Sequence, residues 1–303
     1  MAHSETARHT HHHSPDLNHL NRAFIWGIAL NLGFVCVEFG SGLWLDSLAL
    51  ISDAGHNFSD VISLVLAMLA FKLVKVKPSA RYTYGYKKST VLVSLLNACI
   101  LLVAVGIILT ESIQKLSHPP VVEGGAIAWI AGAGIVINAF TAWLFRKDRE
   151  KDLNVKGAYL HMAADTLVSA GVLVSGVLMQ YTGWYLLDPI IGMVIAVVIL
   201  LSTAGLLHDS LRLSLDGVPA GIYPEKIGRL LQEADPRIRD VHHIHIWAIS
   251  TTENALTAHV VIPDPEALEE IKCTLKKLLK ARHIQHTTLE FELPDGECGM
   301  QCS

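Results

Sequence analysis

The stretch SLALISDAGHNFSDVISLVLAMLAF, residues 47–71, decides the class of this protein. It is long and apolar enough to cross a bilayer as a helix, which takes about 20 residues. Yet it contains His56 and Asp60, which lie four residues apart and therefore share one face of a helix. Ionisable side chains inside a membrane span are costly, so they indicate either a functional pathway or a hydrogen bond between packed helices.

A second apolar stretch repeats this spacing. LNVKGAYLHMAADTLVSAGVL, residues 153–173, contains His161 and Asp165. Two matching pairs favour a functional site over a packing contact. A helix rises about 1.5 Å per residue, and the two spans cross the membrane in opposite directions. Counted from the span ends, Asp60 is then expected at the depth of His161, and His56 at the depth of Asp165, near the middle of the membrane.

Together the four side chains predict a site for a divalent cation. Two imidazole nitrogens and two carboxylate oxygens suit the tetrahedral coordination of Zn²⁺. Mg²⁺ and Ca²⁺ prefer more oxygen ligands and no histidine, whereas Co²⁺, Fe²⁺, Ni²⁺ and Cd²⁺ stay compatible with this set. Ligation requires neutral histidine, so the cation competes with protons for the same atoms. A site of this kind that faces each side of the membrane in turn would exchange a metal ion for protons.

Composition extends the membrane interpretation to most of the chain. The 303 residues are 51% hydrophobic and only 17% charged, and the mean hydropathy is +0.40. Soluble domains rarely combine so little charge with so much aliphatic content. A net charge of −4 without a long basic stripe gives no indication of nucleic-acid binding. Six membrane spans are predicted in the bilayer, at residues 22–45, 47–73, 88–115, 121–145, 155–181 and 184–208.

The loops predict the orientation of these spans. Residues 72–88 and 146–156 are rich in lysine and arginine, whereas the loops at the other ends of the spans are almost free of them. Basic loops stay on the cytoplasmic side, so we expect both termini in the cytoplasm of a multi-pass protein of the inner (cell) membrane. Three domains are predicted: a histidine-rich cytoplasmic tail, a transport domain and a cytoplasmic metal-binding domain, at residues 1–21, 22–208 and 209–303.

The last domain has the pattern of a small α+β fold. Its predicted elements are, in order, a helix, two strands, a helix and a strand, at residues 223–234, 241–249, 255–262, 264–283 and 287–293. In the last strand Leu289, Phe291 and Leu293 are expected to point one way, and Glu290 and Glu292 the other.

Histidines and acidic residues are the candidate metal ligands of this domain. Strict alternation along VHHIHIWAI places His243 and His245 on one strand face and His242 on the other. His242, His259 and an acidic residue of the last strand are then expected to meet on one surface; exposed histidines without a metal are the alternative. The candidate ligands are His242, His259, Glu290, Glu292, Cys298 and Cys302.

Two further features have weaker interpretations. Six histidines in the first 19 residues are expected to bind metal loosely and to raise its local concentration; an expression tag is the alternative, although the interrupted run favours a native tail. Asp53 lies one turn before His56 and is a candidate for an auxiliary role, by hydrogen-bonding a ligand or guiding ions, with a purely interhelical role equally open.

Two other classes of function are alternatives. An intramembrane metalloenzyme also places histidine and aspartate in spans, but the sequence has no H-E-x-x-H motif and no nucleophile paired with a base. A membrane-anchored metal sensor would require a signalling domain, for which the sequence has no indication. The transporter interpretation is therefore preferred.

The two H-x-x-x-D stretches, the six spans and a tail with HHIHIWAI resemble the cation diffusion facilitators, in particular the bacterial zinc-exporting branch. The resemblance covers residues from about 20 to 293. It implies a homodimer with a ferredoxin-like tail, in a dimerising cytoplasmic domain at residues 209–303, that exports zinc from the cytosol in exchange for protons. Export of a broader or different set of metals, such as Cd²⁺, Co²⁺, Ni²⁺ or Fe²⁺, is the alternative. It also implies that His56, Asp60, His161 and Asp165 are the transport ligands.

In the tail, the resemblance implies that His242, His259 and Glu292 match zinc ligands of other members. Glu290 falls where some members have histidine, and a histidine expected on the intervening helix is missing. Bound zinc in this domain would act as a regulator, in addition to zinc as the transported substrate.

Overall fold

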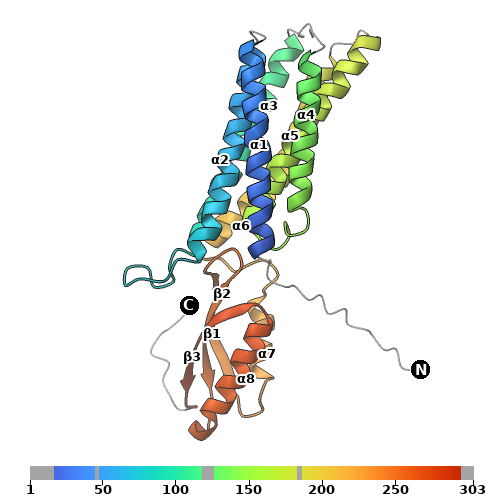
Figure 1. The fold of residues 1–303 in the computed structure, drawn as a ribbon. Helices are drawn as coiled ribbons and strands as arrows, with labels where there is room; N and C mark the ends of the chain where they lie inside the picture. Colours follow the sequence, from blue (N-terminus) through green and yellow to red (C-terminus); the bar gives the residue numbers. More distant parts are fainter. Residues whose placement is uncertain (1–16, 45–47, 118–125, 183–185, 295–303) are drawn as a thin grey trace, which may run out of the picture.

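The computed structural model describes residues 17–44, 48–117, 126–182 and 186–294. The first histidines of the tail and Cys298 and Cys302 lie outside these ranges, and so do the side chains of Asp53 and His56, although both belong to a described helix. In the described part, six long helices run side by side and a small α+β domain follows beyond one end of the bundle (Figure 1). The helices are α1 (Leu17–Trp44), α2 (Leu48–Val74), α3 (Ser89–Ser117), α4 (Ala126–Phe145), α5 (Leu153–Thr182) and α6 (Leu187–Ser214).

This bundle is a helical transmembrane domain. Within the described ranges, three stretches are long and apolar enough to cross a bilayer: Arg22–Ser41, Ser89–Gln114 and Pro189–Ser214. Large apolar side chains such as Val103, Val136 and Leu201 point outward from the bundle. A helix that is apolar on its outer face as well as its inner face is typical of a lipid environment. The last helix continues beyond its predicted end at residue 208.

Aromatic and small side chains hold the tail-facing half of the bundle together. Phe24 of α1 lies between Phe71 of α2 and Phe145 of α4, with ring centroids 5.6 and 4.8 Å apart. Ala67 of α2 and Ala158 of α5 are buried in the same cluster. Small residues at such a contact allow helix backbones to approach closely, and here they bring α2 against α5.

The tail domain has the predicted order of elements. They are α7 (Pro224–Gln232), β1 (Asp240–Ala248), β2 (Asn254–Val261), the 3₁₀ turn η1 (Pro265–Ala267), α8 (Leu268–Ala281) and β3 (Ile284–Glu292). The described strands form one sheet in the order β1-β2-β3, in which β2 pairs antiparallel with β1 and parallel with β3. The crossover between the parallel strands is made by α8.

Both helices of this domain cover the same face of the sheet. Leu231 of α7 and Leu275 of α8 are buried in one core with Leu256 and Val260 of β2. Leu289 and Phe291 of β3 pack against this core, whereas Glu290 and Glu292 lie on the opposite, open face, which confirms the predicted alternation for these four residues. Leu293, which was predicted to continue it, lies beyond the end of β3 and is exposed. The open face therefore receives the polar side chains of all three strands.

The tail domain contacts the end of the bundle through charged and hydroxyl side chains. The Nζ of Lys88, just before α3, donates to the carbonyl oxygens of Leu213 and Ala248 at 2.8 and 3.1 Å and lies 2.6 Å from Asp216 Oδ1. Lys87 pairs with Glu253 of the β1–β2 loop at 2.6 Å. These contacts place the ends of α3 and α6 directly against the sheet.

Candidate metal-binding sites

The intramembrane cluster lies where α2 packs against α5. Asp60 comes from α2, and His161 and Asp165 from α5. Asp60 Oδ1 is in hydrogen-bond contact with His161 Nε2, and Asp165 Oδ2 lies 3.9 Å from the same nitrogen. One ligand atom from each of the three side chains lies within 4.8 Å of the others, a spacing that a single metal ion could bridge. The contact of Asp60 with His161 confirms the pairing expected from their depth along the two helices.

Burial gives this cluster its chemistry. Asp60 and His161 are almost completely buried, and Asp165 is partly buried. Ionisable groups that have lost their water need a partner of opposite charge, a hydrogen bond or a metal ion. Neutral imidazole nitrogen and carboxylate oxygens can ligate zinc, and the same atoms can hold protons when no metal is bound.

The fourth predicted ligand is His56, which lies in α2 one helical turn before Asp60. Its side chain, like that of the auxiliary candidate Asp53, is outside the described part of the structure. The pairing of His56 with Asp165 therefore stays a prediction.

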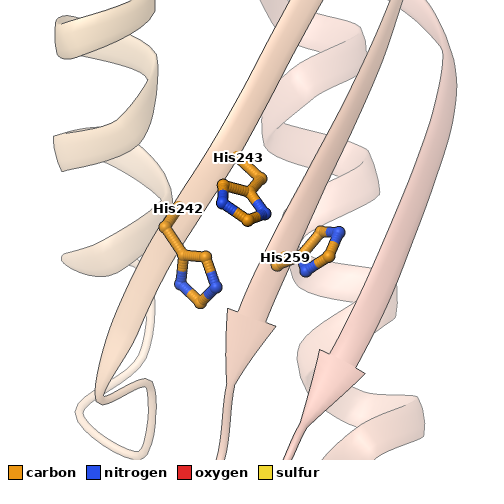
Figure 2. A group of neighbouring side chains, drawn as sticks. All are labelled: His242, His243 and His259. Carbon is orange, nitrogen blue, oxygen red and sulfur yellow. The ribbon is translucent and has the colours of Figure 1, made fainter. Parts of the chain in front are cut away.

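A second cluster lies on the open face of the tail domain. His242 of β1 stands directly opposite His259 of β2. Figure 2 shows their rings gathered with that of His243, and the ring centroids are 4.9 to 5.4 Å apart. One nitrogen of each of the three rings lies within 4.8 Å of the others.

Acidic side chains surround these histidines. Glu292 Oε1 lies 2.6 Å from His259 Nδ1, and its other oxygen lies 3.4 Å from His242 Nε2. Glu290 Oε2 is 3.5 Å from His259 Nε2, and Asp240 Oδ2 is 2.9 Å from His242 Nδ1. The structure thus brings His242, His259, Glu290 and Glu292 together, as the sequence predicts.

His243 was placed incorrectly by strict alternation. A β-bulge sets His243 and Ile244 of β1 opposite Ala258 alone, because His242 pairs with His259 and His245 with Thr257. His243 adopts a φ of +49° at this point. The extra residue shifts the phase of the strand, so that His242 and His245 share the open face and the ring of His243 joins His242 and His259. A short run of histidines gives no signal for such a bulge.

A buried carboxylate lies between the two domains. Asp152, just before α5, accepts hydrogen bonds from the backbone N–H groups of Asn154 and Val155 at 2.7 and 3.2 Å, and from the Thr251 hydroxyl of the tail domain. Burial raises the pKa of the Asp152 carboxyl above its ordinary value of 3.8, although these hydrogen bonds act in the opposite direction. Sequence reasoning missed this residue because its tail partner lies 99 positions away.

Comparison with known proteins covers both domains. Residues 24–213 match the family model of the cation efflux transmembrane domain, and residues 219–292 match that of the cation efflux protein cytoplasmic domain. Zinc transporter ZitB of Escherichia coli strain K12 is 33% identical over 294 residues, which cover 96% of this chain and 93% of the relative.

Two other relatives match the chain with similar identity and over a similar length. A cadmium, cobalt and zinc/H(+)-K(+) antiporter of Bacillus subtilis strain 168 is 32% identical over 287 residues, 93% of this chain and 91% of the relative. Metal cation efflux system protein CzcD of Cupriavidus metallidurans is 33% identical over 296 residues, 96% of this chain and 92% of the relative.

Proposed function

Because the chain belongs to the cation efflux family, we propose that it exports divalent metal cations, zinc foremost, from the cytoplasm in exchange for protons. Family members are transporters, so the alternative of an intramembrane metalloenzyme is set aside. The relatives named as zinc transporter and as cadmium, cobalt and zinc antiporter support both the zinc assignment and a broader set of metals.

The observation that carries this proposal is the contact of Asp60 with His161 beside Asp165. In the metal-loaded state, His161 would bind zinc through the Nε2 of a neutral imidazole. The carboxylates of Asp60 and Asp165 would be the second and third ligands, and His56 would be the fourth. In the metal-free state, Asp60 and His161 are joined by a hydrogen bond. Zinc would compete with protons for the carboxylate oxygens and imidazole nitrogens of this cluster, and that competition would link the two fluxes.

A transport assay tests this function. In proteoliposomes with an imposed pH gradient, wild-type protein should accumulate zinc and move protons in the opposite direction. His161→Ala and Asp165→Ala should abolish both fluxes, because each removes a ligand from a buried site. Asn138→Ala, which changes a buried polar residue of α4 outside the cluster, is the control and should transport zinc. Fluxes of wild-type size in both ligand variants would overturn the assignment.

We also propose six membrane spans with both termini in the cytoplasm of the inner membrane. Support comes from the basic loops around residues 72–88 and 146–156, and from the position of the tail domain at the end of the bundle where these loops lie (Figure 1). Cysteines introduced in the loop around residue 80 should then react with a membrane-impermeant reagent only after the membrane is opened.

We propose that the protein is a homodimer and that zinc in its tail regulates transport. Residues 219–292 match the model of the cation efflux protein cytoplasmic domain, which bears the name ZT_dimer, and this match supports the dimer. The cluster of His242, His243, His259 and Glu292 supports a tail site of nitrogen and oxygen ligands. Zinc should bring the two tail domains of the dimer closer, as measured by spin-label distances; an unchanged distance would contradict regulation by this site.

A further inference from the structure

A small cavity lies beside the intramembrane cluster, on the side that faces the tail domain. Its volume is about 10 Å³, and its lining residues are Asp60, Ser63, Leu64, Asn97, Gly157, Ala158 and His161. Ser63 follows Asp60 toward the end of α2 that leads to the tail domain. Gly157 precedes His161 by one turn, toward the end of α5 that touches the tail domain. An ion that moves between the cluster and that end of the bundle would pass this cavity.

Two buried oxygens line the cavity without a hydrogen-bond partner in the described part of the structure. They are Ser63 Oγ of α2 and Asn97 Oδ1 of α3. Only 6% of Ser63 and 4% of Asn97 is exposed, so neither side chain is solvated from outside the bundle. Buried polar atoms are rarely left unpaired, and such atoms around a space of one water-sized particle indicate a polar occupant.

The approach of α3 to α5 is what brings Asn97 to this place. Gly157 has no side chain, and a Cβ built there would lie 3.7 Å from Asn97 Cβ and 3.5 Å from Leu206 Cδ2. A methyl group would therefore fit at residue 157 in ordinary van der Waals contact, but it would occupy space beside the amide. The third helix thus contributes a polar group to a site that sequence reasoning assigned to the second and fifth helices alone.

We propose that Ser63 and Asn97 form a transient binding site for the transported cation, next to Asp60 and His161, which the cation occupies before it reaches the cluster. We call this site the entry station. This inference rests on the proposed function. The two neutral oxygens replace water oxygens of the arriving ion while the ion begins to contact the Asp60 carboxylate. A station of this kind lowers the barrier to dehydration, and because its oxygens carry no net charge it holds the ion weakly enough to release it. The final selection between metals is left to the histidine-containing cluster.

The test compares the rate of transport with binding at equilibrium, in full-length protein. Zinc uptake into proteoliposomes is measured for wild type, Asn97→Leu, Ser63→Ala and Gly157→Ala. Zinc bound at equilibrium is measured on the same samples, and the fraction lost in His161→Ala defines binding at the cluster. Asn31→Leu is the matched control. Asn31 is also a buried amide, but its Nδ2 donates hydrogen bonds to Thr141 Oγ1 and to the Gly27 carbonyl, and it does not line this cavity.

We expect Asn97→Leu to lower the initial rate by about tenfold, which corresponds to about 1.4 kcal/mol of barrier height. Ser63→Ala should lower the rate less, and cluster binding should stay at the wild-type level in both. Gly157→Ala should also slow transport by occupying the cavity, and it serves as the test if Asn97→Leu does not fold. Asn31→Leu should transport at the wild-type rate.

Wild-type rates in Asn97→Leu and Gly157→Ala would overturn the entry station while leaving the proposed function intact. Loss of equilibrium binding at the cluster in Asn97→Leu would also overturn it, because Asn97 would then support the cluster itself. An absence of zinc transport in the wild type would instead overturn the proposed function, and this inference with it.

Discussion

The hydroxyl of Thr251 donates a hydrogen bond to the carboxylate of Asp152, which connects the β1–β2 loop of the tail domain to the first turn of α5. Since α5 carries His161 and Asp165, a displacement of the tail domain can reach the metal cluster through a single helix. One carboxylate thus serves both as the cap of α5 and as the contact with the tail domain.

The stability of this junction should depend on pH. Because burial raises the pKa of Asp152 above 3.8, the folded state binds this proton more tightly than the unfolded state. The contribution of protonated Asp152 to stability is therefore fully present below pH 3.8 and is lost as the pH rises through the raised pKa. Asp152→Asn should remove this dependence, as measured by thermal unfolding in detergent over a pH series.

Asp152→Ala is the matched comparison for this prediction. Asparagine keeps an oxygen that can cap α5, whereas alanine removes it. Asp152→Ala should therefore lower the free energy of unfolding by about 0.5–2 kcal/mol. The same pH dependence in wild type and Asp152→Asn would show that another group is responsible.

Lys88 should be important for docking of the tail domain. Its ammonium group contacts the Leu213 and Ala248 carbonyls and Asp216, and Lys88→Met removes all three contacts. Because the side chain is about one-third exposed, solvent screening weakens these contacts. We therefore expect Lys88→Met to lower the free energy of docking of the tail domain by only about 1 kcal/mol. Limited proteolysis of the residues between α6 and α7 should be faster. Lys272→Met, which removes the pair with the exposed Glu269, should leave proteolysis unchanged.

His243 should affect stability and zinc binding in opposite directions. Its φ of +49° disfavours any side chain, by about 1–2 kcal/mol, while a glycine in a strand has an entropic disadvantage of about 0.5–1 kcal/mol. His243→Gly should therefore stabilise the metal-free protein by roughly 0.5–1 kcal/mol. Because His243 belongs to the proposed zinc site, the rise in thermal stability on adding zinc should become smaller.

His245→Gly is the control for that experiment. His245 is exposed on the same strand and pairs with Thr257. Glycine there should lower the stability of the metal-free protein and leave the response to zinc unchanged. A full zinc response in His243→Gly would show that His242, His259 and the glutamates bind the metal without His243.

His161→Asp should shift the metal preference of transport. The exchange of imidazole for carboxylate makes the ligand set harder, which suits Mn²⁺ better than Zn²⁺. The ratio of manganese to zinc flux in proteoliposomes should rise. His208→Asp, the same change in α6 outside the cluster, should keep the wild-type ratio. An unchanged ratio in His161→Asp would indicate that His161 does not contact the ion.

Much of the architecture follows from local pattern. The apolar runs predict the six long helices to within a few residues at most ends, because hydrophobic length is a property of each segment alone. Alternation of Leu289 and Phe291 with the two glutamates predicts the faces of β3 for the same reason. Equal depth along antiparallel helices was enough to pair Asp60 with His161.

By itself, then, the sequence determined which residues are ionisable and where each lies along its own helix or strand. Only the tertiary structure decided that Asn97 joins Ser63 beside the cluster, and that His243 turns toward His259 through a bulge. It likewise decided that Asp152 meets Thr251. The physical reason is that periodicity sets the direction of a side chain within one element, whereas the register between elements depends on the packing of residues far apart in the chain.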